Sequence, residues 1–255
     1  MNTLVHGGAR TKAIGVIVPV HDEEDLLGHA LEAIDQAFFR VGGQGIACRS
    51  AIVLDDCNDS SATIAQRWVD ALGLRGGEHQ AMVVRSHSAS VGRARRTGSD
   101  ALLRAWADTD LRHIWLATTD ADSRVPYDWL VTQLNAHECG TDLWTGRVVV
   151  DDWSHYHQST ARRWSEAYDN EDAPIHGANL GFNALAYVDA GGFTAQATGE
   201  DRALYHAIVA RGGRTHYDSV VKVVTSGRRH ARAPMGFSYA LTSVEAGSQA
   251  EEMMA

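Results

Sequence analysis

Asp120 and Asp122 are the residues of this sequence whose type and spacing point most directly to chemistry. They end the apolar run at residues 113–119, and side chains two residues apart on an extended segment project from the same face. Paired carboxylates suit Mg²⁺ or Mn²⁺, which usually keep coordination positions open for substrate phosphates. The structural alternative is a turn in which both aspartates accept hydrogen bonds from backbone amides. An EF-hand is excluded, because the positions that need glycine and glutamate hold Val125 and Val131.

Asp55 and Asp56 follow a second apolar run, at residues 51–54. A carboxylate here could accept a hydrogen bond from the imide N–H of a uracil or from the edge of a guanine. Residues 58–60 (Asn-Asp-Ser) are typical of a turn and a helix cap. That structural use accounts for the residues after the pair, but it leaves two acids at the end of an apolar strand unexplained.

Glu200 and Asp201 open a segment with helical spacing at residues 200–211. Acidic residues in a first turn complement the helix dipole, which is a sufficient structural reason for the pair. The functional alternative makes Asp201 a general base that deprotonates an acceptor hydroxyl. The residues alone leave both interpretations open.

Alternating strands and helices must position these acids. The pattern predicts strands at residues 13–20, 51–54, 81–84 and 113–119, with helices at 24–39, after Ser60, at 93–107 and from Pro126. Four strand–helix units in a row predict an α/β fold, with a mostly parallel central sheet and helices on both faces. Ligands of such sheets gather at the carboxyl ends of the strands, where the acids lie.

The regular alternation of strand and helix patterns changes after about residue 140. We expect strands at residues 142–150, 179–183 and 215–224, and helices at 158–168 and 200–211. Residues 245–255 are polar and small, which predicts a frayed tail. The absence of repeats and low-complexity linkers favours one continuous domain over residues 1–255.

Composition excludes several classes of protein. The chain has 255 residues, 44% of them hydrophobic and 22% charged, which is typical of a globular domain. Its formal net charge of −9 argues against nucleic acid or an anionic membrane surface as a partner. The apolar run at residues 13–20 is far shorter than the roughly 20 residues of a membrane span, and no secretory signal is visible. Three cysteines without zinc or redox spacing predict a reduced, cytoplasmic chain.

Missing motifs exclude other chemistries. The first strand is not followed by a Gly-x-Gly-x-x-Gly loop, which argues against a dinucleotide-binding oxidoreductase. Neither Lys12 nor Lys222 follows a glycine, so a P-loop is excluded, and no Gly-x-Ser-x-Gly elbow is present. His155 and His157 lack a third zinc ligand at a usual spacing.

The ordered set of motifs resembles family 2 glycosyltransferases over roughly residues 13–232. The matching segments are the opening strand at 16–24, the acidic motif at 55–59, the helix start at 91–98, the Asp-x-Asp at 119–122, the acceptor-side stretches at 177–180 and 191–193, and the catalytic acid motif at 199–201. The resemblance implies a GT-A fold, a Rossmann-like sandwich. It implies that residues 13–140 bind a nucleotide-diphosphate sugar and residues 141–235 bind the acceptor.

The same resemblance implies roles for individual residues. Those it assigns are Pro19 and Glu23 in the nucleoside wall, Asp56 or Asp55 on the base, Arg96 beside the nucleotide, Asp120 on the ribose or metal, Asp122 and His230 on the metal, and Asp201, next to Glu200, as the catalytic base. Arg228, Arg229 and Arg232 form a cationic cluster that could clamp phosphate oxygens. A solvated surface cluster is the alternative for these arginines.

The expected activity is a metal-dependent transfer of one sugar, with Mn²⁺ or Mg²⁺ and with UDP ahead of GDP as the nucleotide. Attack by a small or lipid-linked hydroxyl acceptor, with Asp201 as base, would invert the configuration. Polymer synthesis is disfavoured, because Gln-x-x-Arg-Trp does not follow Asp201. One alternative is a sugar nucleotidyltransferase, which would need a Gly-rich basic loop where residues 22–25 are acidic. Another is a sugar-nucleotide-binding protein without catalysis; an oligomer is compatible with all three.

Overall fold

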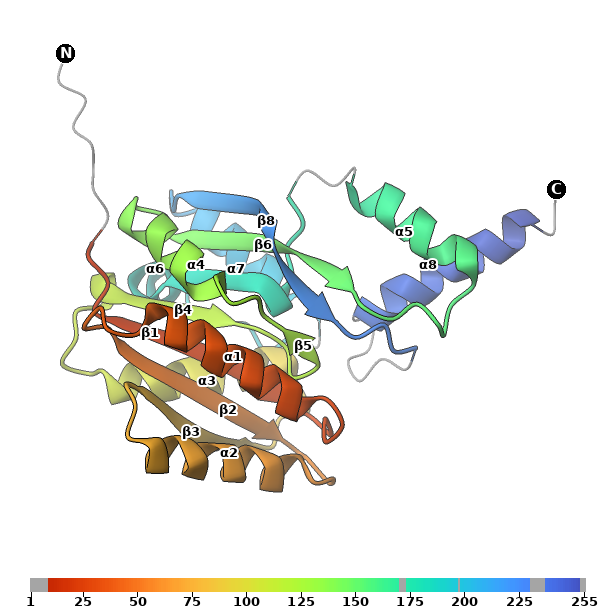
Figure 1. The fold of residues 1–255 in the computed structure, drawn as a ribbon. Coiled ribbons are helices and arrows are strands. Elements are labelled where there is room, and N and C mark those ends of the chain that lie inside the picture. The colour runs from red at the N-terminus through yellow and green to blue at the C-terminus, as the bar shows by residue number, and fades with distance from the viewer. Residues whose placement is uncertain (1–8, 170–172, 197, 230–236, 253–255) are drawn as a thin grey trace, which may run out of the picture.

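The computed structural model describes residues 9–169, 173–196, 198–229 and 237–252. Within them, eight strands form one sheet in the order β3-β2-β1-β4-β7-β6-β8-β5 (Figure 1). The strands are β1 (Ala13–Val20), β2 (Ala47–Asp55), β3 (His79–Ser86), β4 (Ile114–Thr118), β5 (Ser123–Arg124), β6 (Leu143–Val150), β7 (Leu180–Asn183) and β8 (Thr215–Thr225). The first four pair in parallel, whereas β7 runs antiparallel to both of its neighbours. The predicted α/β class with a mostly parallel sheet is confirmed.

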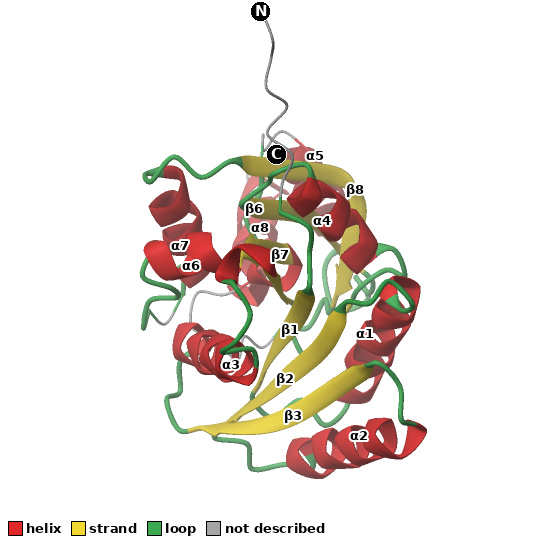
Figure 2. Ribbon diagram, turned by 90° about the vertical axis from the view of Figure 1, so that its left-hand side faces the viewer, coloured by secondary structure: helices red, strands yellow, loops and turns green. Residues whose placement is uncertain are grey.

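Helices cover both faces of the sheet, as Figure 2 shows. They are α1 (Leu27–Val41), α2 (Ser61–Arg75), α3 (Val91–Ala105), α4 (Trp129–Glu138), α5 (Gln158–Asp169), α6 (Ala184–Asp189), α7 (Glu200–Val209) and α8 (Phe237–Glu252). One core joins α1, α2 and α4 to one face of the sheet, and a second core joins α3, α6 and α7 to the other. Val16 of β1 packs in the first core and Ile17 in the second, which explains why the predicted strands are continuous apolar runs.

The structure corrects the end of the chain. Residues 245–252 belong to helix α8, where the sequence predicts a frayed tail. The helix is held because Leu241 is fully buried and because the Glu245 carboxylate pairs with Arg229 and accepts a hydrogen bond from the His157 amide. Helices α8 and α5 pack side by side (Figure 1).

Two further elements escaped prediction because each is too short to show a period. Strand β5 has two residues, and α6 has six. Helix α6 depends on a cap instead: the Asn183 side chain accepts hydrogen bonds from the amides of Leu185 and Ala186.

Candidate active-site cleft

A cleft of about 660 Å³ opens where strands β1, β2 and β4 end. The N-terminal ends of α3 and α7 form part of its wall, and residues of α5 and α8 form another part. Among the described residues that line it, the acids are Glu23, Asp55, Asp120, Asp122, Glu200 and Asp201, and the arginines are Arg95, Arg202 and Arg228. Five of the predicted site acids and Pro19 are therefore brought together with Asp201, as the parallel strands require.

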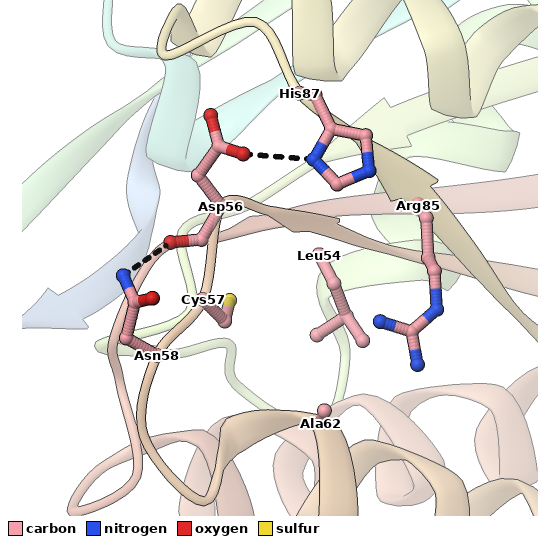
Figure 3. A pocket seen from close by; sticks show the side chains of 7 residues that line it. All are labelled: Leu54, Asp56, Cys57, Asn58, Ala62, Arg85 and His87. Atoms are coloured by element: carbon pink, nitrogen blue, oxygen red, sulfur yellow. Dashed lines mark hydrogen bonds and ion pairs between the residues drawn. The ribbon is translucent and has the colours of Figure 1, made fainter.

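The neighbours Asp55 and Asp56 point into different hollows. At Asp56 the backbone turns into the left-handed region, with φ of 50°, which aspartate tolerates better than most residues. Its carboxylate lies 2.8 Å from Nδ1 of His87, beside a small second hollow lined also by Arg85 and Cys57 (Figure 3). Asp56, the first of the two candidates for the base, does not line the main cleft.

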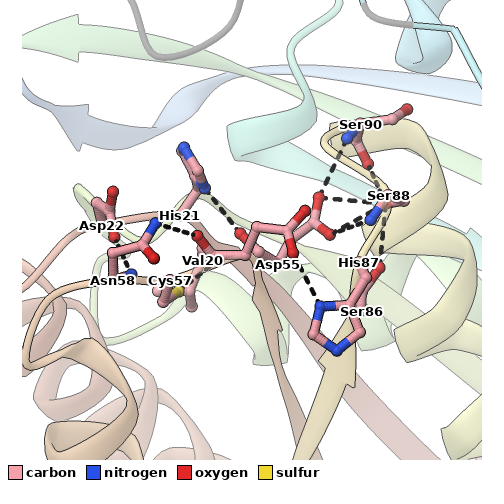
Figure 4. A network of polar contacts seen from close by, with 11 residues as sticks. Val20, His21, Asp22, Asp55, Cys57, Asn58, Ser86, His87, Ser88 and Ser90 are labelled. Atoms are coloured by element: carbon pink, nitrogen blue, oxygen red, sulfur yellow. Dashed lines mark hydrogen bonds and ion pairs between the residues drawn. The ribbon is translucent and has the colours of Figure 1, made fainter.

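Asp55 is the acid of this pair that faces the cleft. Its carboxylate accepts hydrogen bonds from the amides of Ser88 and Ser90, at 2.8 and 3.1 Å, and from the Ser88 hydroxyl (Figure 4). Burial alone would raise the pKa of Asp55, but these donors outweigh it, so the pKa lies below its usual value. The carboxylate is therefore ionised and held in one orientation.

Asp120 and Asp122 lie in the cleft as predicted, and each meets an arginine. Asp120 pairs with Arg95 of α3. Asp122 lies 3.0 Å from Nη2 of Arg228, and Arg228 also pairs with Glu23 at 2.6 Å. Burial raises the pKa of Asp122, while the charge of Arg228 opposes that rise.

Arg95 is buried and connects three elements of the site. Its guanidinium pairs with Glu200 of α7 and with Asp120, and Nε donates to the Thr118 hydroxyl of β4 at 3.2 Å. It also lies flat against Gly177, where a Cβ atom would come within 2.4 Å of the guanidinium carbon. Gly177 is thus needed for this close approach.

Asp201 is oriented by backbone amides at the start of α7. Its carboxylate accepts hydrogen bonds from Gly177 and from Arg202, both at 2.8 Å. Gly199 precedes the helix with φ of 80°, a conformation that favours glycine. Glu200 points away into the buried pair with Arg95; burial raises its pKa, and the Arg95 charge opposes the rise.

Besides Asp56, two predicted site residues lie outside the cleft, and another is not described. Arg96 donates to the carbonyl oxygens of Gly191 and Phe193 and does not line the cleft. Arg229 pairs with Glu245 of α8, with its guanidinium 5.1 Å from the centre of the Tyr156 ring. His230 lies outside the described residues.

Arg95 lines the cleft in place of the predicted Arg96, and of the predicted cationic pair Arg228 lines the cleft and Arg229 does not. The period of α3 carries the signal for Arg95, because Arg95, Ser99 and Leu102 share one buried face of that helix and Arg96 does not. The cationic cluster pointed to Arg228 and Arg229 alike. No periodicity chooses between them, because Arg228 follows the last residue of β8 by three positions in an irregular loop.

Four aromatic side chains form the side of the cleft that belongs to α5 and α8, and sequence reasoning missed them as a group. Trp164, Tyr168, His176 and Phe237 all line the cleft, and we call them the aromatic wall. Neighbouring ring centres lie 5.1 to 5.9 Å apart around the set. Burial lowers the pKa of His176 to about 4, so this imidazole is neutral near pH 7.

Sequence comparison agrees with this geometry. The family model for glycosyl transferase family 2 matches residues 15–190, which include most of β1, the Asp-x-Asp motif and Gly177. The chain belongs to glycosyl transferase family 2. No curated protein matches the sequence significantly.

Solved structures of other glycosyltransferases share the fold of this family member. S. aureus TarS (residues 1–349) matches with 13% identity and a TM-score of 0.59, over 84% of this chain and 60% of that one. The mannosyltransferase PcManGT from Pyrobaculum calidifontis, solved with GDP-Man and Mn²⁺, matches with 19% identity and a TM-score of 0.56, over 99% and 78%. Glucosyl-3-phosphoglycerate synthase from Mycobacterium tuberculosis, solved with Mn²⁺, UDP and phosphoglyceric acid, matches with 14% identity and a TM-score of 0.53, over 92% and 77%. The chain thus spans about 60% of the TarS fragment that it matches.

The carboxylate oxygens in the cleft are suitable ligands for a divalent cation. Asp120 and Asp122 offer hard carboxylate oxygens, and the buried Asp122 already requires a positive partner, a place that Arg228 takes in this structure. Another group in the described residues, Asp22, Cys57 and Asp59, has potential ligand atoms within 4.8 Å of one another. There the carboxylates accept backbone hydrogen bonds that join the loops after β1 and β2, as from Asn58 to Asp22 at 2.6 Å.

None of the helices in the described ranges combines the length and apolar character needed to cross a bilayer.

Proposed function

We propose that this family 2 glycosyltransferase moves one sugar from a nucleotide-diphosphate sugar to a hydroxyl of a discrete acceptor, with inversion of configuration. UDP is our first candidate for the nucleotide and GDP the second. Neighbours of the same fold were solved with UDP and with GDP-Man, each with Mn²⁺, which supports keeping both. The free state of Cys48, Cys57 and Cys139 is compatible with the cytoplasmic setting that we propose for it.

The charge of the cleft is the observation that carries this proposal. Its described lining holds six acids against three arginines, and a nucleoside diphosphate adds further negative charge. Such a ligand binds here only together with a cation. Asp122 and Asp120 would hold Mn²⁺ or Mg²⁺, and the bound ion would stabilise the charge that develops on the departing diphosphate.

Residues of the chain itself supply the remaining roles. Asp55, ionised and fixed by Ser88 and Ser90, is the candidate for a hydrogen bond from the N–H groups of the base, with Pro19 in the same wall. Glu23 contributes through its pair with Arg228.

Asp201 is our candidate for the general base. Both of its oxygens accept a backbone hydrogen bond, which fixes its orientation, and each keeps lone pairs for an acceptor hydroxyl. Glu200 is only 3% exposed and is engaged with Arg95, so we assign it the role of holding the start of α7. The proton therefore goes to Asp201 rather than to its neighbour.

Slow hydrolysis of the donor tests the proposal against its alternatives. UDP-glucose and GDP-mannose are incubated with the protein and Mn²⁺, and the products are identified by mass spectrometry and ³¹P NMR. A glycosyltransferase releases UDP or GDP, and a matching reaction without Mn²⁺ is far slower. A sugar nucleotidyltransferase would instead form nucleoside triphosphate when pyrophosphate is added, and a binding protein would release nothing.

A further inference from the structure

Tyr168 and His176 form a hydrogen-bonded chain at the edge of the cleft. The Tyr168 hydroxyl, on α5, accepts the amide proton of Val148 in β6 at 3.0 Å. It lies 2.8 Å from Nε2 of His176. A hydroxyl that accepts a hydrogen bond from Val148 can still donate its own proton, here to Nε2 of His176. The neutral ring must in that case carry its proton on Nδ1.

The second ring nitrogen of His176 is Nδ1. Among the described residues, Nδ1 has no hydrogen-bond partner, although the ring lines the cleft. The next residue is Gly177, whose amide donates to Asp201. The residue that follows this imidazole in the chain therefore contacts the candidate base directly.

The rest of the aromatic wall is apolar and partly open to the cleft. Trp164 and Phe237 are half-buried, with ring centres 5.1 Å apart, and both line the cleft. The cationic Arg147 is not available to the cleft here, because it pairs with Asp169 at 2.6 Å and lies over the Tyr168 ring. The described lining of the cleft holds six acids against the three arginines Arg95, Arg202 and Arg228, and this excess disfavours an acceptor with a phosphate or carboxylate group.

We propose that the aromatic wall is the acceptor subsite, that His176 positions the acceptor by donating a hydrogen bond from Nδ1, and that the acceptor is an uncharged hydroxyl compound with a ring, such as a glycoside. This inference rests on the proposed function, because the subsite would hold the acceptor to which the sugar is transferred. His176 is a positioning residue for the hydroxyl that Asp201 deprotonates. Apolar walls with a few placed polar groups are the usual construction of a small-molecule site.

The tautomer of His176 can be measured without any ligand. Imidazole ¹⁵N spectra of the full chain, with the His176 signal assigned by its loss in His176→Gln, should show a neutral Nδ1–H ring from about pH 5.5 to 8. Tyr168→Phe should convert this ring to the Nε2–H form that is commoner in water. A wild-type ring with Nε2–H, or one protonated near neutrality, would overturn the proposal.

Binding of two probes tests the acceptor class. Saturation-transfer NMR compares phenyl β-D-glucopyranoside, a neutral glycoside, with 3-phosphoglycerate, its charged counterpart. The glycoside should bind the wild type and Tyr127→Ala, an exposed aromatic control outside the cleft. In Trp164→Ala its affinity should fall about two- to tenfold. Binding of the phosphoglycerate instead, or an equal glycoside signal in Trp164→Ala, contradicts the proposal.

Two substitutions of His176 separate positioning from packing. The amide nitrogen of His176→Asn lies near the place of Nδ1, and that of His176→Gln near the place of Nε2. We expect the asparagine variant to keep glycoside binding and the glutamine variant to lose about two- to tenfold, the value of one neutral hydrogen bond. Equal losses would mean a structural role only.

Nucleotide binding, followed by calorimetry with UDP or GDP and Mg²⁺ on the same wild-type sample, distinguishes the two proposals. Glycoside binding without nucleotide binding would refute the proposed function, while the aromatic wall would still be a glycoside-binding site. Nucleotide binding without glycoside binding would refute the proposed acceptor subsite and would remain consistent with the proposed function.

Discussion

The two sides of the cleft are built by different interactions. On the side of β1, β2 and β4, ionised groups meet in networks such as Glu23–Arg228–Asp122 and Asp120–Arg95–Glu200. On the side of α5 and α8, the aromatic wall makes ring contacts and includes a histidine that burial keeps neutral. The charged side matches a donor that arrives with a cation, and the aromatic wall matches a neutral acceptor. The comparison predicts that changes on the charged side alter donor binding and chemistry, whereas changes in the wall alter acceptor binding.

The largest effect is expected at Asp122. Asp122→Ala removes a carboxylate that would hold the cation, so metal-dependent donor binding should be lost while the fold persists. Titration calorimetry with UDP or GDP, with and without Mn²⁺, measures this directly. Thermal unfolding serves as the control for folding. A donor affinity equal to that of the wild type would refute the metal assignment.

Asp201→Asn should have the next largest effect. The amide keeps the shape of the side chain but cannot take a proton, so turnover should fall by about two orders of magnitude or more. Donor affinity should stay near the wild-type value, because the proposed role of Asp201 is toward the acceptor hydroxyl and not toward the donor. Nucleotide release in the presence of acceptor gives the rate. Near-normal turnover would place the base on another residue.

The contrast between Arg95 and Arg96 sharpens the description of the charged side. Arg95→Met leaves Glu200 buried without its partner and should cost about 3 kcal/mol of unfolding free energy. Arg96→Met is the matched control on the next residue; it loses hydrogen bonds to two carbonyl oxygens and should cost about 1 kcal/mol. Urea denaturation monitored by fluorescence compares the two variants. Equal losses of unfolding free energy in the two variants would contradict the role of Arg95 as the buried partner of Glu200.

The charged side was largely predictable from the sequence because continuous apolar runs mark the buried parallel strands, and the acids at their ends must meet at one edge. Asp120, Asp122 and the presence of an acid at position 55 or 56 follow from that rule. The choice between Asp55 and Asp56 did not follow, because it depends on one left-handed backbone conformation. The aromatic wall did not follow either, because Trp164 and Phe237 lie far apart in the chain and meet only through the packing of α5 on α8.

The acid dependence of stability should also distinguish the two sides of the cleft, by the range of pH in which each contributes. The pKa of His176 falls to about 4 in the folded chain, from an ordinary value of 6.5, so folding favours the neutral ring. The contribution of His176 to the free energy of unfolding is therefore complete above pH 6.5. It is lost as the pH falls from 6.5 toward about 4. The pKa of Asp55 lies below its ordinary value of 3.8, so its contribution is complete above that value and is lost only at lower pH. The difference in unfolding free energy between wild type and His176→Gln should therefore change between about pH 6.5 and 4, and that between wild type and Asp55→Asn only below about pH 4. Differences that change over the same range of pH for both variants would mean that the two sides of the cleft are not electrostatically distinct.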